Sequence, residues 1–152
     1  MFETPVSVLV RRPLVRIERD APLREATRLL RQQRTRCLAV MDRGRLLGIF
    51  TDRDMVERCF TPAVTGETLV GAVMESPVVS VRADTSVGEA LRLMDQERIR
   101  HLPLVDESGA LVGLIRSRDL LEYIAEALPE LILNQPPAAA AGWRTREGGG
   151  HG

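Results

Sequence analysis

Residues 11–55 read RRPLVRIERDAPLREATRLLRQQRTRCLAVMDRGRLLGIFTDRDM, and residues 75–120 read ESPVVSVRADTSVGEALRLMDQERIRHLPLVDESGALVGLIRSRDL. The second stretch repeats the first with one extra residue in a turn. Identical residues recur at the matched positions: Pro13 and Pro77, Ala26 and Ala90, Arg34 and Arg98, then Gly48 and Gly113, Arg53 and Arg118, Asp54 and Asp119. Such internal similarity indicates two copies of one folding unit.

Each copy predicts the same order of elements, which is strand, helix, strand, strand, helix. Ser86 and Glu89 have the spacing of a capping box at the start of one helix, and Pro22 opens the matching helix. The expected strands are 14–17, 38–41 and 46–50 in the first copy and 78–81, 102–105 and 111–115 in the second, with closing helices at 52–59 and 117–127. The predicted class is α+β with two small sheets.

One copy is too short to bury both faces of a three-stranded sheet, so the two copies are expected to pack about an approximate two-fold axis with clefts between them. The expected divisions are 1–64 for the first repeat, 65–128 for the second, and 129–152 for a C-terminal extension. That extension holds paired prolines, four alanines and a run of glycines, and is expected to be largely disordered.

Composition excludes several classes of function. Arginines and acidic residues balance at 21 each, so no global field favours nucleic acid or an anionic membrane. The start, MFETPVSVLVRR, does not have the pattern of a secretion signal, and no stretch approaches the roughly 20 apolar residues of a membrane span, which predicts a cytoplasmic protein. Cys37 and Cys59 are too isolated for a zinc site, and no catalytic constellation is evident, so neither an enzyme nor a cofactor is expected.

The segment GIFTDRD, residues 48–54, runs from the end of a strand into a helix. Thr51 and Asp54 would project from the same first turn, where a hydroxyl can donate to a phosphate oxygen and a carboxylate can accept from ribose hydroxyls. The same Thr-x-x-Asp spacing is also typical of ordinary helix capping. Both interpretations fit the sequence.

The repeat, this motif and the strand RHLPLVD together resemble the CBS domain family over about residues 5–128. The resemblance implies a stand-alone, regulatory, energy-sensing pair of bacterial type, with a purine nucleotide in the cleft. Ribose would lie on the motif aspartate, phosphate at the threonine, and adenine against the first strand of the other repeat. The first site would then comprise Thr51, Asp54, Pro77, Val78, Val79, Arg100 and His101. His101 also fits a partly buried strand residue at the interface.

The second site departs from this pattern, because Arg116 stands where the first motif has its hydroxyl. The arginine can meet a phosphate bidentately or point to solvent, and both options remain open. Ala39 also replaces the proline found at position 103. The resemblance assigns this doubtful site to Leu14, Val15, Arg36, Arg116 and Asp119.

The expected ligand is AMP, ADP, ATP or an adenosyl compound such as S-adenosylmethionine, acting on an effector protein in trans. A homodimer is expected through apolar residues of the closing helices, namely Val56, Leu121, Ile124 and Leu128. The alternative is a ligand-independent dimerisation or interaction module with vestigial clefts. Trp143, in the C-terminal extension, fits an anchor for a partner and fits equally a residue that simply lies on the surface.

Overall fold

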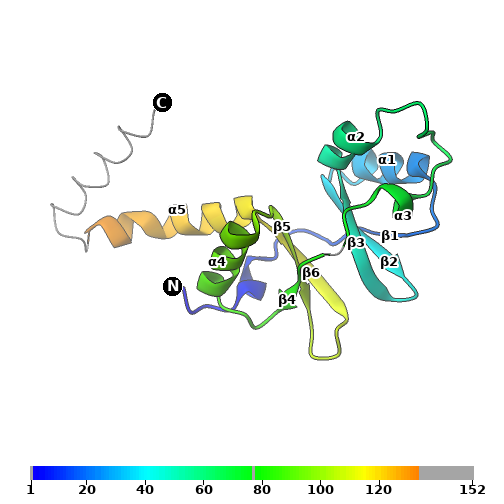
Figure 1. The fold of residues 1–152 in the computed structure, drawn as a ribbon. Helices are drawn as coiled ribbons and strands as arrows, with labels where there is room; N and C mark the ends of the chain where they lie inside the picture. The colour runs from blue at the N-terminus through cyan, green and yellow to red at the C-terminus, as the bar shows by residue number, and fades with distance from the viewer. Residues whose placement is uncertain (1, 77, 134–152) are drawn as a thin grey trace, which may run out of the picture.

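The computed structural model describes residues 2–76 and 78–133, and it consists of two similar α+β halves (Figure 1). The first half contains β1 (Arg16–Glu18), α1 (Leu23–Gln32), β2 (Cys37–Asp42), β3 (Arg45–Thr51) and α2 (Asp52–Arg58). The second contains β4 (Val81–Arg82), α4 (Val87–Glu97), β5 (His101–Val105), β6 (Leu111–Arg116) and α5 (Ser117–Leu133). The predicted α+β class and the two repeats are confirmed.

Each half has a three-stranded sheet with the middle strand parallel to the first and antiparallel to the third. The hairpin registers carry an irregularity at equivalent places, after Val40 in β2 and after Leu104 in β5. The first hairpin turns through Arg43 and Gly44, both with positive φ, as a tight two-residue turn requires. The halves therefore share details of register as well as element order.

Several predicted boundaries were wrong. Leu14 and Val15 precede β1, and Val78 and Val79 precede β4, so both first strands begin later than the apolar runs suggested. The reason is that β1 and β4 pair with only three and two residues of their neighbours. Helix α2 ends at Arg58, and α5 continues beyond 127 to Leu133, the short extension that the apolar residues 131–133 allow in the sequence. The predictions for the tail after residue 133, Trp143 included, lie outside the described residues.

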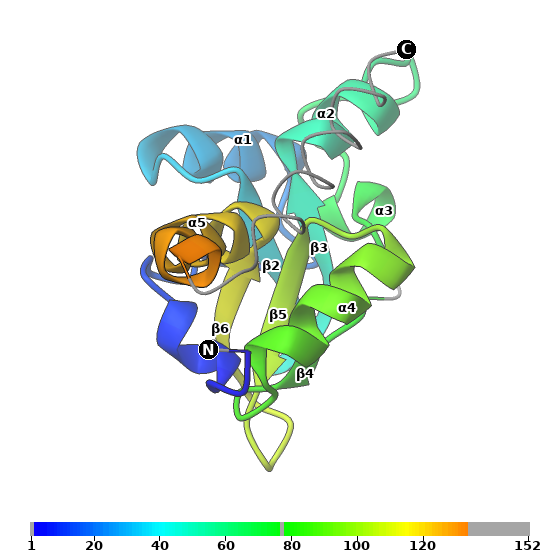
Figure 2. The same cartoon turned by 90° about the vertical axis from the view of Figure 1, so that its left-hand side faces the viewer.

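Two short helices absent from the prediction cross between the halves. The 3-10 helix η1 (Val6–Leu9) buries Val6 and Leu9 in the core of the second half, with Val87, Leu102 and others. Helix α3 (Val70–Val73) packs into the core of the first half. Figures 1 and 2 show η1 beside α4 and α5, far from the sheet that follows it in sequence. Each half is therefore completed by a segment that precedes the other half's sheet.

The exchange follows the repeat, since positions 6–9 and 70–73 are equivalent. Matching bridges anchor the two segments, Pro5 to Ser86 and Pro22 to Leu69. A third bridge joins Ile49 in β3 to Glu75, where the chain crosses closely over Gly48. A smaller cluster of Ala39, Met41 and Leu111 joins the two hairpins. These contacts hold the two halves side by side and create the surface on which the clefts lie.

Candidate functional site

The main cleft lies between the repeats and has a volume of about 300 Å³, the lower end of the range for small-molecule sites. Its walls come from the ends of β3 and β6, the first turns of α2 and α5, and the segments leading into β4 and β5. The lining residues are Arg36, Ile49, Thr51, Asp52, Arg53, Glu75, Val78, Val79, Arg98, Ile99, Arg100, His101, Arg116, Ser117 and Arg118. Both repeats thus contribute to a single cleft.

The lining is strongly cationic, with six arginines against two carboxylates, an excess of four positive charges in a protein of net charge zero. Four of the arginines form ion pairs: Arg36 with Asp52, Arg53 with Glu57, Arg116 with Asp119, and Arg118 with Glu122. Within residues 2–76 and 78–133, no ion pair is found for Arg98 or Arg100. These two guanidinium groups are the cations most available to a bound anion.

Backbone bonds fix the two arginine-bearing segments beside the helix starts. The N–H of Ser117 donates to the carbonyl of Arg100 at 2.9 Å, and in the other repeat the N–H of Asp52 donates to the carbonyl of Arg36 at 3.1 Å. The arginine before each middle strand is therefore held next to the first turn of its closing helix. Arg36 and Arg100 lie at equivalent positions and both line the main cleft.

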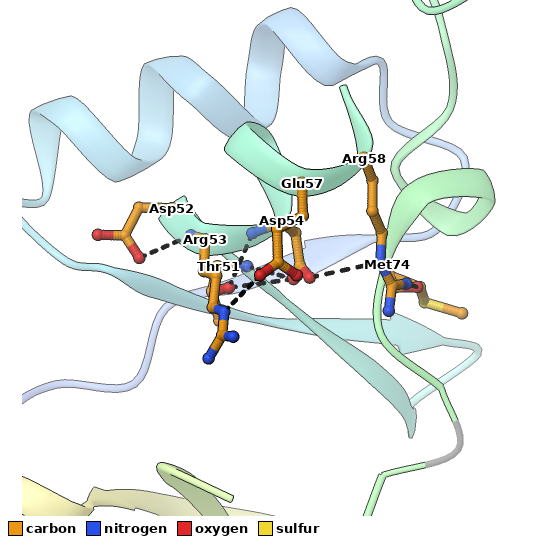
Figure 3. Close-up of polar contacts among 7 residues, drawn as sticks. All are labelled: Thr51, Asp52, Arg53, Asp54, Glu57, Arg58 and Met74. Carbon is orange, nitrogen blue, oxygen red and sulfur yellow. Dashed lines mark hydrogen bonds and ion pairs between the residues drawn. The ribbon is translucent and has the colours of Figure 1, made fainter. Parts of the chain in front are cut away.

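Thr51 and Asp54 form a complete capping box at the start of α2 (Figure 3). The N–H of Thr51 donates to Asp54 Oδ2 at 2.9 Å, and the N–H of Asp54 donates to Thr51 Oγ1 at 3.2 Å. The Asp54 residue is only 3% exposed and is not part of the cleft lining. On its other side Arg58 Nε lies 3.7 Å from Asp54 Oδ1. The structure therefore confirms that this motif caps the helix.

The predicted first-site residues fall into three groups. Thr51, Val78, Val79, Arg100 and His101 line the main cleft together. The motif aspartate at position 54 lies behind the threonine, and its role toward ribose stays a prediction. The remaining residue, Pro77, lies outside the described residues.

His101 occupies the first position of β5, opposite Arg116 of β6, and is partly buried. Burial lowers the pKa of its imidazole below the ordinary value. The carboxylates of Asp52 and Asp54 oppose that shift, and the guanidinium groups of Arg116 and Arg100 add to it. The ring is therefore mainly neutral at pH 7 and can donate one hydrogen bond and accept another. His101 lines the cleft, and its contact with a ligand stays a prediction.

A second, smaller pocket lies beside the first and has a volume of about 40 Å³. All five residues of the predicted second site line it, together with Arg12, Pro13, Thr35, Cys37 and Leu114. Arg116 does not point to solvent, and its contact with a phosphate stays a prediction. Its guanidinium instead binds the carboxylate of Asp119, with Nη2 to Oδ1 at 3.0 Å and Nε to Oδ2 at 3.5 Å.

The sequence did not predict several residues that line the main cleft, namely Asp52, Arg53, Glu75, Arg98 and Arg118. The repeat itself offered a signal for three of them, because Arg53 and Arg118 occupy equivalent positions in the two motifs and Arg98 matches Arg34. No such signal exists for Glu75, which enters the cleft through its bridge to Ile49.

Other chemistry finds little support in the described part of the chain. No group of three or more His, Cys, Asp or Glu side chains there is placed to hold a metal ion. Burial raises the pKa of the Cys37 thiol far above its ordinary value, which makes it a poor nucleophile. In residues 2–76 and 78–133, no helix has the length and apolar character needed to cross a membrane.

The geometry defines a tandem pair of α+β repeats that share a cationic cleft. The sequence profile of the CBS domain matches residues 6–60 and 70–126, and the chain belongs to this family. The CBS domain-containing protein YhcV of Bacillus subtilis is 37% identical over 98 residues, which cover 64% of this chain and 69% of YhcV. Other curated relatives are longer, and the matches span 48% of one and 29% of another.

Solved structures show the same fold. The CBS domain structure NE2398 has a TM-score of 0.73 and 26% identity, covering 80% of this chain and 97% of that one. The cytosolic domain of the Mg²⁺ channel MgtE, solved in complex with ATP, has a TM-score of 0.67 and 31% identity. That match covers 80% of this chain and 49% of the MgtE chain.

Proposed function

We propose that this protein is a cytoplasmic regulatory module, not an enzyme, that binds AMP, ADP, ATP or a related adenosyl compound in the main cleft. The observation that carries the proposal is the concentration of six arginines around one cleft between the repeats. A cationic cleft with low-dielectric walls attracts anions strongly even when the whole protein is neutral. The relative MgtE, with 31% identity, was solved in complex with ATP.

The cleft divides into a polar and an apolar part that suit the two ends of a nucleotide. Arg98 and Arg100 supply cations for phosphates, and a guanidinium can bind a phosphate bidentately. Val78 and Val79, partly buried, supply an apolar wall for a base. In this proposal Asp54 accepts the ribose hydroxyls after its capping bonds to Thr51 rearrange.

The regulatory output is proposed to pass through the closing helices to a second copy and to an effector protein. Val56 on α2 is 64% exposed and Leu121 on α5 is 63% exposed, and these positions are equivalent in the two repeats. Phe60, just after α2, is 81% exposed. Exposed apolar side chains at matched places favour a homodimer through these helices. A nucleotide that bridges the repeats would change this surface only by its differential affinity for two orientations.

The second candidate function is a ligand-independent interaction module. A specific observation favours it, because both motif aspartates are already bound within the chain, Asp54 in a capping box and Asp119 by Arg116. In that case the clefts would be vestigial and only the helical surface would act.

Thermal unfolding against AMP, ADP, ATP, GTP, NAD and S-adenosylmethionine distinguishes these two functions. A ligand at 100 times its dissociation constant adds about 2.7 kcal/mol, which raises Tm by several degrees in a chain of this size. We expect a shift with adenosine ligands that Arg100→Gln reduces strongly. The matched control is Arg31→Gln, which removes an exposed arginine of α1 outside the cleft. No shift with any compound would support the interaction module.

A further inference from the structure

Each motif aspartate accepts an equivalent backbone hydrogen bond, but the side chains that bind the two carboxylates differ. Asp54 Oδ2 accepts the N–H of Thr51 at 2.9 Å, and Asp119 Oδ2 accepts the N–H of Arg116 at 2.8 Å. The first carboxylate then binds a small hydroxyl, whereas the second binds a guanidinium. The equivalent helix starts of the two repeats therefore carry different side-chain arrangements.

An arginine approaches each aspartate, but from opposite ends of the motif. Arg58 reaches Asp54 from the last turn of α2 and lines neither the main cleft nor the second pocket. Arg116 reaches Asp119 from the end of β6 and lines both. Only in the second arrangement does the arginine that binds the aspartate also line a ligand pocket.

The Arg116–Asp119 pair is well enclosed, with side chains 21% and 9% exposed. Both carboxylate oxygens are engaged, Oδ1 by Nη2 and Oδ2 by Nε and the backbone N–H. A charge-assisted, two-point contact of this kind is stronger than an ordinary hydrogen bond. Three of the roughly four acceptor positions of the Asp119 carboxylate are therefore used while the pair stays closed.

The second pocket otherwise has the character of a nucleotide site. Leu14, Val15 and Leu114 give apolar surface, and Arg12 and Arg36 give cations. Its volume of about 40 Å³ holds only a few water molecules. The pocket is therefore small, and the carboxylate that lines it, Asp119, is bound by the guanidinium of Arg116, which lines the pocket too.

We propose that Arg116 occludes the second pocket by binding Asp119, so that this chain binds one nucleotide, and that removing this guanidinium creates a second nucleotide site. The proposal rests on the proposed function in that it takes a nucleotide as the ligand class. It adds a residue that sets the number of ligands per chain.

Calorimetric titration with ATP tests the proposal by stoichiometry. Arg116→Thr restores the Thr-x-x-Asp pattern of the first repeat, and we expect two ATP per chain against one for the unmodified protein. The double variant Arg116→Thr/Asp119→Ala should return to one. Arg31→Gln is the matched control, since Arg31 lines neither the main cleft nor the second pocket, and it should keep one site. If Arg116→Thr does not fold by circular dichroism, Arg116→Gln replaces it.

The outcomes separate this proposal from the proposed function. One site in the unmodified protein and one in both Arg116 variants would overturn the occlusion, as would two sites in the unmodified protein. No binding by the unmodified protein, with one site in Arg116→Thr that Asp119→Ala removes, would support the occlusion and overturn the nucleotide role of the main cleft. No binding by any variant would overturn both.

Discussion

The two repeats have the same elements and registers, yet their side chains differ at matched positions of the middle strands, the motifs and the closing helices. Thr51 corresponds to Arg116, Cys37 to His101, Ala39 to Pro103, and Arg58 to Tyr123. The helix starts that follow the two hairpins are alike, since a backbone N–H donates to the motif aspartate at 2.9 Å in one repeat and at 2.8 Å in the other. The framework is set by backbone pairing and burial, which leaves the cleft side chains free to diverge.

The largest expected difference between the repeats is in the unfolding free energy lost when the matched glycines, Gly48 and Gly113, are replaced by alanine. A Cβ at Gly48 would stand 2.4 Å from the carbonyl oxygen of Glu75 and 2.9 Å from Met74 Sδ, whereas one at Gly113 would stand 3.1 Å from Val10 Cγ2. Overpacking costs roughly 1–3 kcal/mol, and the cost is greater when backbone must move. We expect Gly48→Ala to lose about 3 kcal/mol of unfolding free energy in urea, and Gly113→Ala about 1 kcal/mol. Equal losses would show that the contact between Gly48 and Glu75 is no tighter than the matched contact between Gly113 and Val10.

A smaller effect is expected from the titration of His101, which has no titrating counterpart because Cys37 is buried with a raised pKa. Burial lowers the folded pKa of His101, so the unfolded chain binds more protons below neutrality. Stability should therefore fall as pH drops below about 6.5, the ordinary histidine pKa, and the loss should level off below the folded pKa.

His101→Cys copies the first repeat and should flatten this part of the profile. The measurement is Tm between pH 7.5 and pH 5, with the difference between the two proteins isolating the histidine from the carboxylates. An identical pH dependence in the variant would contradict the assignment to His101.

The smallest effects are expected at the ends of α1 and α4. Arg34 and Arg98 both adopt left-handed backbone, with φ of 51° and 55°, a conformation that costs an L residue about 1 kcal/mol and glycine much less. Arg34→Gly and Arg98→Gly should each raise stability by about 0.5 kcal/mol after the added flexibility of the unfolded chain is counted.

Ligand binding should separate these two variants, because Arg98 lines the main cleft and Arg34 lines neither pocket. Nucleotide affinity should fall only in Arg98→Gly. A fall of equal size in both variants would mean that the conformation of the loop, and not the guanidinium, affects binding.

The sequence predicted the hairpins and amphipathic helices of both repeats, because these elements are long enough to leave a periodic pattern. The structure places five residues of the predicted first site in the main cleft and all five of the second site in the second pocket, and their roles toward a ligand stay predictions. The sequence did not predict η1 and α3, whose four residues each carry no periodicity and are placed by packing against the other half.

The Arg116–Asp119 pair was missed for a different reason. A spacing of three residues is compatible with a side chain that points outward or inward, and only the enclosed geometry at the end of β6 selects the ion pair. The capping box at Thr51 and Asp54 was foreseen as one of two interpretations, since its spacing is itself the signature.

The exchange of η1 and α3 also affects the order of events during synthesis. The N–H of Val6 donates to the carbonyl of Thr85, so this segment has no completed partner until the second repeat has been translated. The first sheet likewise needs residues 70–73 before its core closes. Contacts that join distant parts of a chain slow folding and leave apolar surface exposed meanwhile. The core of the first half can therefore close once residues 70–73 have been translated, whereas η1 stays without its partner until the second repeat is complete.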